Sequence, residues 1–117
     1  MILNKIRYKL KYIRTYFEIK HAIKDNKSCV LYFDKRGIGK TASLMKLGNK
    51  YNIPIIEPSS RIKELTYNYP NVNIIPPSKW VVMGTNYPLI IIDEGIGDSY
   101  IDWLLSVGQN IIVITSK

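Results

Sequence analysis

The strongest constraint on the fold is that short apolar runs alternate with helical segments along the whole chain. Three of these runs are Cys29–Phe33, Leu89–Ile92 and Ile111–Thr115. An uninterrupted apolar run of this length is typical of a strand that is buried on both faces of a sheet. Strands that alternate with helices favour a parallel sheet with helices on both faces. We therefore expect an α/β protein, a three-layer sandwich around a mostly parallel sheet of about four to five strands.

The remaining elements continue this alternation. Two more strands are expected at Ile53–Ile56 and Val72–Ile75, and helices are expected over residues 2–24, 40–50 and 98–107. A further helix is expected to start at Ser59 or Ser60, either of which suits a helix cap, and to continue through Leu65.

Length and composition bound the class of protein. The chain has 117 residues, of which 46% are apolar and 22% are charged, which fits one globular domain and neither a disordered chain nor a membrane protein. Its longest uncharged runs are shorter than the roughly 20 residues that a spanning helix needs. The single cysteine, Cys29, excludes an intramolecular disulfide framework and a cysteine-based zinc site. We expect a cytoplasmic protein, in the host cytoplasm if a bacteriophage encodes it, because one cysteine suits a reducing compartment and no secretory leader is visible.

The positive charge is concentrated at the N-terminus. Residues 1–27 carry a net charge of +6, against +8 for the whole chain. Two apolar stripes run along the helix expected at residues 2–24, one through Leu3 and Phe17 and one through Tyr8 and Ile23, and Lys and Arg occupy the remaining face. We divide the chain into a basic amphipathic helix, residues 1–27, and a main domain, residues 28–117.

This basic helix has three interpretations. It can lie on nucleic acid, an anionic membrane can bind it instead, or its apolar stripe can pack on the core or on another subunit while the basic face is solvated. The first is preferred to a membrane because the rest of the chain carries a phosphate-binding pattern. The side chains that would contact nucleic acid are Lys5, Arg7, Lys9, Lys11 and Arg14.

That pattern is the segment Asp34–Thr41, which lies between an apolar strand and an amphipathic helix. It matches G-x-x-x-x-G-K-[ST] except that Asp34 stands at the first glycine. Such a loop turns backbone N–H groups towards a phosphate, and the start of the following helix adds its dipole. The expected phosphate-binding residues are Gly37, Ile38, Gly39, Lys40, Thr41 and Ala42. Lys40 would bridge the β- and γ-phosphates, and the hydroxyl of Thr41 would bind magnesium.

Two adjacent carboxylates end a second strand. Leu89–Ile92 is followed directly by Asp93 and Glu94. In a phosphate-loop protein the first acid holds the metal shell and the next one polarises the attacking water. We therefore expect Asp93 beside magnesium, together with Thr41, and Glu94 beside the water.

With these motifs in place, the chain resembles P-loop NTPases of the additional-strand, catalytic-glutamate class, which includes AAA+-like, helicase-like and packaging ATPases. The resemblance covers residues 20–117, and Asp34–Thr41 is similar to loops of bacteriophage and mobile-element ATPases. It implies ATP and Mg²⁺ as ligands, Lys40 and Glu94 as catalytic residues, and a polar sensor residue at the end of the last strand, here Thr115 or Ser116. It also implies an oligomer or a larger protein partner.

Three departures from the family separate the possible functions. Asp34 replaces the first glycine of the loop pattern. Proteins of the family have a further strand, and often a helical lid, after the strand that corresponds to Ile111–Ser116. The main domain contains two arginines, Arg36 and Arg61, neither of which is an obvious catalytic arginine. The last strand is therefore expected as a sheet edge that a partner covers. Arg61 is a candidate for a catalytic arginine that acts across a subunit interface, but an ordinary surface ion pair is expected instead. Glu57 follows the second strand, near where ligands bind in such sheets, but is expected to be a solvated acid.

Three functions follow from this sequence. The first is a magnesium-dependent ATPase that acts on or with nucleic acid. The alternative is a regulatory P-loop module that binds nucleotide weakly or without hydrolysis and docks on a larger protein. A small-molecule kinase ranks third, because the chain has too few arginines to clamp a transferred phosphoryl group.

Overall fold

Strands and helices alternate in the computed structural model of the chain, which describes residues 2–33, 39–84 and 86–116. For residues 2–12 and for Val81 it describes the backbone alone. In chain order the elements are α1 (Ile2–Asp25), β1 (Cys29–Phe33), α2 (Lys40–Tyr51), β2 (Ile55–Ile56), α3 (Ser59–Asn68), β3 (Ile74–Ile75), α4 (Lys79–Met83), β4 (Ile90–Ile92), α5 (Asp98–Ser106) and β5 (Ile111–Ser116).

The five strands form one sheet in the order β1-β5-β4-β2-β3, and every neighbouring pair is parallel. β5 lies between β1 and β4 and pairs with both of them. On its other side, β4 pairs with β2, where Ile55 lies opposite Ile91 and Ile56 lies opposite Ile92. The expected parallel α/β sheet is therefore confirmed.

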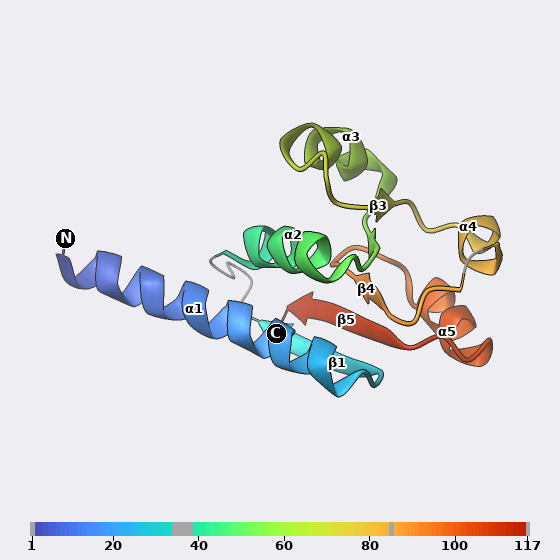
Figure 1. Cartoon of the computed structure of the whole chain (residues 1–117), viewed down its shortest axis with the longest axis horizontal. Helices are drawn as coiled ribbons and strands as arrows, with labels where there is room; N and C mark the ends of the chain where they lie inside the picture. Colours follow the sequence, from blue (N-terminus) through green and yellow to red (C-terminus); the bar gives the residue numbers. More distant parts are fainter. Residues whose placement is uncertain (1, 34–38, 85, 117) are drawn as a thin grey trace.

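Alternate residues of the strands point into two separate cores. Ile55, Ile91 and Ile112 pack with buried residues of α1, α2 and α3, whereas Ile56 and Ile92 pack with buried residues of α4 and α5. Successive side chains of a strand point to opposite faces, so the two cores lie on opposite faces of the sheet. Helices thus cover both faces, and the three-layer architecture is confirmed (Figure 1).

α1 packs on the sheet and on α2 through the C-terminal part of its second apolar stripe. Ile19 and Ile23 are buried in the core, whereas Ile13 and Phe17 of the first stripe are about half exposed. The N-terminal half of α1 extends past the sheet and away from the other elements (Figure 1). No helix in the described ranges is long and apolar enough to cross a membrane.

Several element boundaries differ from those expected. α4 was not expected, and β2 and β3 are each two residues shorter than the strands expected at Ile53–Ile56 and Val72–Ile75. Pro58, not a serine, holds the cap position of α3, and no side chain caps this helix. Pro58 has φ −56° and ψ 140°, an extended conformation that the ring of proline allows, so the helix begins at Ser59.

The expectation that the last strand forms a sheet edge was wrong. β5 is flanked by β1 and β4, and in the described sheet β1 and β3 are the outer strands. On β1, Val30 and Tyr32 are 47% and 58% exposed. The error arose because the place of a strand in a sheet depends on its crossover connections, which a run of apolar residues does not encode.

Amide exchange distinguishes these strand positions. The amides of Ile112–Ile114 are expected to exchange slowly, because both sides of β5 are paired, whereas alternate amides of β1 point away from the sheet and exchange quickly. Hydrogen exchange followed by NMR measures both sets. Rapid exchange throughout β5 would contradict the strand order, and uniform protection of β1 would show that another chain covers it.

Candidate functional site

The candidate site lies at one edge of the sheet. Because the strands are parallel, their carboxyl ends meet at the same edge, where ligands bind in open α/β sheets. Glu57 directly follows β2, and Asp93 and Glu94 directly follow β4. Thr115 and Ser116 close β5, and Lys40 begins the helix that comes after β1. The fold therefore collects residues that are far apart in the sequence.

Gly39 fixes the start of α2. It has φ 75° and ψ 9°, a left-handed conformation that glycine adopts without steric cost, and its carbonyl accepts a hydrogen bond from the N–H of Ser43. Lys40, Thr41 and Ala42 follow in the first turn of the helix and are partly exposed. The first N–H groups of a helix lack intrahelical partners, so this turn has donors for an anion. Gly37 and Ile38, expected in the same cradle, lie outside the described residues.

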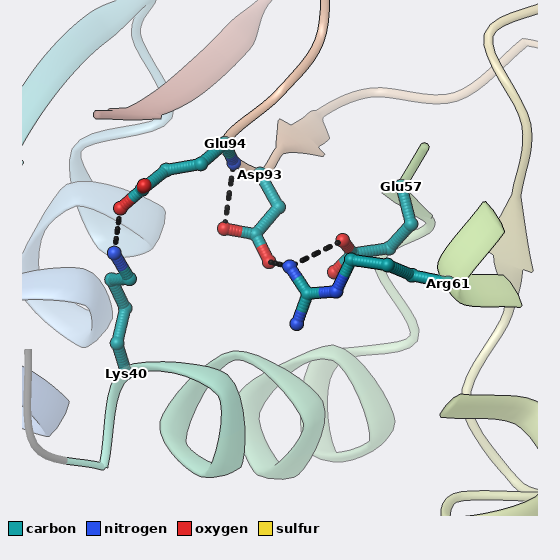
Figure 2. Close-up of polar contacts among 5 residues, drawn as sticks. All are labelled: Lys40, Glu57, Arg61, Asp93 and Glu94. Atoms are coloured by element: carbon teal, nitrogen blue, oxygen red, sulfur yellow. Dashed lines mark hydrogen bonds and ion pairs between the residues drawn. The ribbon is translucent and has the colours of Figure 1, made fainter. Parts of the chain in front are cut away.

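Lys40 and Glu94 are in direct contact (Figure 2). The ammonium group of Lys40 pairs with Oε1 of Glu94, and the lysine side chain is 12% exposed. Burial lowers the pKa of Lys40 below its ordinary value, and the negative charge of Asp93 opposes this shift. The lysine expected to hold phosphate and the acid expected to activate water thus neutralise each other in this state.

Asp93 is buried beside this pair. Its Oδ1 accepts a hydrogen bond of 2.8 Å from the backbone N–H of Glu94, and its Oδ2 lies 3.7 Å from a guanidinium nitrogen of Arg61. The same nitrogen lies 3.5 Å from Oε1 of Glu57. Figure 2 shows the guanidinium group of Arg61 between the two carboxylates.

One expectation about this region was wrong, because Glu57 was expected to be a solvated acid, yet it is fully buried. Arg61 forms ion pairs from a partly exposed position, as expected, but both of its partners are buried. The sequence does carry one signal, the i,i+4 spacing of Glu57 and Arg61. That spacing does not reveal the contact with Asp93, which arises because β2 and β4 are neighbours.

Glu57 holds a proton more tightly than an ordinary glutamate. Burial, with the nearby Asp93 as the next contributor, raises its pKa from 4.5 to about 9, and Arg61 opposes this rise only in part. Glu57 is consequently neutral at pH 7.

The expected sensor residues lie at the same edge. Thr115 and Ser116 stand opposite Tyr32 and Phe33 at the end of β5 and are partly exposed. In the described part of the chain, no hydrogen bond joins either of them to Glu94. Of the basic residues expected to contact nucleic acid, Arg14 is exposed on α1. The side chains of Lys5, Arg7, Lys9 and Lys11 lie outside those that the structure describes.

The oxygen atoms of the site suit a hard cation. Oδ2 of Asp93 is buried and has no hydrogen-bond partner among the described residues. Carboxylate and hydroxyl oxygens are ligands that Mg²⁺ accepts, and it commonly uses one or two carboxylates while keeping several waters. The buried Oδ2 of Asp93 and the hydroxyl of Thr41, at the start of α2, are therefore oxygen atoms of the kind that Mg²⁺ accepts. In the described ranges, no group of three or more His, Cys, Asp or Glu residues is placed to hold a metal.

Comparisons with known proteins add no family to this description. No protein-family model matches the chain, and neither the curated proteins nor the solved structures include a significant match.

Substituting Glu57 tests its buried, protonated state. In the folded native chain Glu57 keeps its proton up to about pH 9, whereas in the unfolded chain it releases this proton above pH 4.5. The unfolding free energy of the native chain therefore falls as the pH rises from about 5 to about 9, by up to ~1.4 kcal/mol per pH unit. Glu57→Gln has an amide that does not titrate, so it lacks this fall. Urea unfolding in metal-free buffer measures both curves.

The matched control is Glu64→Gln, because Glu64 is exposed on α3. This variant is expected to keep the native pH dependence. Parallel curves for the native chain and Glu57→Gln would show that Glu57 is ionised in the folded state.

Proposed function

We propose that the chain is an ATP-binding P-loop protein and a magnesium-dependent ATPase that acts on or with nucleic acid. The observation that carries this proposal is the convergence of Lys40, Asp93 and Glu94 at the carboxyl edge of the sheet. A left-handed Gly39 directly before Lys40 supports it, because the loop pattern requires a glycine there.

The position of β5 also supports ATP chemistry. It separates β1, which leads into the loop, from β4, which carries Asp93 and Glu94. Neighbouring strands lie about 4.8 Å apart, so the ends of β1 and β4 are separated by roughly 10 Å. In the proposed function this separation places the phosphate loop and the two acids on either side of β5.

In this mechanism each residue has one task. Lys40 and the N–H groups at the start of α2 bind the β- and γ-phosphates. Thr41 and Asp93 would hold Mg²⁺, which would supply positive charge to the phosphate oxygens when bound. Glu94 accepts a proton from the water that attacks the γ-phosphorus, while the bond from that phosphorus to the leaving oxygen of ADP breaks.

Because Glu94 is paired with Lys40, its ability to act as a base would depend on whether a triphosphate is bound. While Lys40 holds Glu94, the carboxylate is not free to accept a proton from water. A bound triphosphate competes for Lys40 with its greater negative charge and so releases Glu94. Water activation would then begin only when phosphate is present.

Substituting Glu94 tests this coupling. Glu94→Gln is expected to stop ATP turnover and to bind ATP about fivefold more tightly, because removing an ion pair of ~1 kcal/mol frees Lys40 for phosphate. Binding is measured with a fluorescent ATP analogue and turnover by phosphate release. Glu64→Gln, at an exposed position, is the control and should match the native chain. ATP turnover by Glu94→Gln would show that Glu94 is not the base that activates water.

The basic face of α1 is proposed to bind nucleic acid. Replacing four basic residues by glutamine, at Lys5, Arg7, Lys9 and Lys11, is expected to weaken binding to DNA or RNA and to reduce its dependence on salt. The reason is that each lost phosphate contact lowers the slope of log K against log salt by about 0.7 to 0.9. Fluorescence anisotropy at several salt concentrations measures this slope.

A matched variant corrects for the loss of net charge. It replaces four exposed lysines outside α1 by glutamine, namely Lys46, Lys50, Lys63 and Lys79. If both variants lose the same affinity, binding depends on overall charge and α1 has no special role.

The exposed strand β1 favours a second function. Val30 and Tyr32 present apolar surface beside an unpaired strand edge, a combination that suits docking on a protein. The chain would then be a regulatory P-loop module, in a homo-oligomer or on a larger partner. Both functions are proposed for the cytoplasm, and a native chain that fails to bind ATP would favour this second one.

A further inference from the structure

Two buried carboxyl groups converge at the ends of β2 and β4. Ile56 and Ile92 are partners in the sheet, so Glu57 and Asp93, which follow them, are neighbours across the two strands. The N–H of Asp93 donates a hydrogen bond of 3.1 Å to the carbonyl of Ile56, which continues the pairing to this level. Glu57 is fully buried and Asp93 is 2% exposed.

Arg61 neutralises this carboxyl pair only loosely. Its guanidinium nitrogen lies 3.5 Å from Glu57 and 3.7 Å from Asp93, beyond the usual 2.7–3.2 Å of an N–H···O hydrogen bond. Both carboxyl oxygens of Glu57 and Oδ2 of Asp93 consequently have no hydrogen-bond partner among the described residues. Three buried oxygen atoms thus face a cation that does not satisfy their hydrogen-bonding capacity.

The arginine is also the most exposed member of the cluster. Its side chain is 42% exposed, so the guanidinium can move into water while the two carboxyl groups cannot. The buried carboxylate of Asp93 requires positive charge nearby, and a divalent cation supplies twice the charge of an arginine. Mg²⁺ and Mn²⁺ prefer carboxylate oxygens and complete their coordination with water.

We propose that Glu57 and Asp93 form a divalent-cation site and that Arg61 occupies this place in the metal-free chain. Metal binding displaces the guanidinium group towards solvent, and Glu57 releases its proton to water as its carboxylate enters the coordination of the ion. The role of this metal in ATP chemistry rests on the proposed function. The site itself is tested without nucleotide, so either proposal can fail while the other stands.

The test measures binding of Mn²⁺ alone by electron paramagnetic resonance, with the full chain and no nucleotide. Arg61→Met removes the competing cation and is expected to bind Mn²⁺ at least tenfold more tightly than the native chain. Adding Glu57→Gln to Arg61→Met should abolish this gain, because the amide is a weaker metal ligand than the carboxylate.

Two controls separate the site from general electrostatics. Lys63→Met removes one positive charge from an exposed position of α3, close in sequence to Arg61, and is expected to leave the Mn²⁺ affinity near the native value. Arg61→Lys keeps a positive charge and should also stay near the native value. An equal gain in Arg61→Met and Lys63→Met, or a gain that survives Glu57→Gln, would overturn the proposal.

A second measurement decides the matter if Arg61→Met does not fold, which circular dichroism reports. In the native chain, Mn²⁺ is expected to broaden the amide NMR signals of Glu57, Asp93 and Glu94 before those of other residues. The exposed acids Glu64 and Asp102 serve as the comparison. Broadening that is no stronger at Glu57 and Asp93 than at these two residues would contradict a metal site.

Discussion

The buried carboxyl group of Asp93 is the constraint on which the rest of the site depends. It lies at the end of β4, which has paired strands on both sides, so it cannot turn into solvent as a surface acid does. Its oxygen atoms are held by the backbone N–H of Glu94 on one side and by Arg61 on the other. A charge in this position persists only with positive groups nearby, and the chain provides them from α2 and α3.

The two cations divide the carboxyl groups between them. Lys40 neutralises Glu94 and Arg61 neutralises Asp93, while Glu57 is uncharged at pH 7, so the four charges of the site balance one another. The ion pairs of such a site can separate when a ligand that carries both positive and negative charge binds. A magnesium–nucleotide complex is such a ligand under the function we propose, because its phosphates would attract Lys40 and its metal would attract the carboxylates. In that proposal the two ion pairs are the arrangement of the site before nucleotide binds.

The local elements of the site were predictable from the sequence, and their mutual placement was not. The strand before the loop, the helix that begins at Lys40 and the strand before Asp93 each leave an apolar pattern in the chain. The neighbours of a strand leave no such pattern, so β5 was assigned to the sheet edge although it lies between β1 and β4. The contact of Arg61 with Asp93 was missed for the same reason, since it depends on β2 lying beside β4.

Hydrolysis of ATP by the native chain in the presence of Mg²⁺, compared with Lys40→Ala, tests the central claim most directly. Lys46→Ala is the matched control, because Lys46 is an exposed lysine of the same helix. The account predicts magnesium-dependent phosphate release that Lys40→Ala abolishes and Lys46→Ala retains, with stimulation by DNA or RNA if α1 binds nucleic acid. Equal rates in all three chains, or no ATP binding by the native chain, would contradict it.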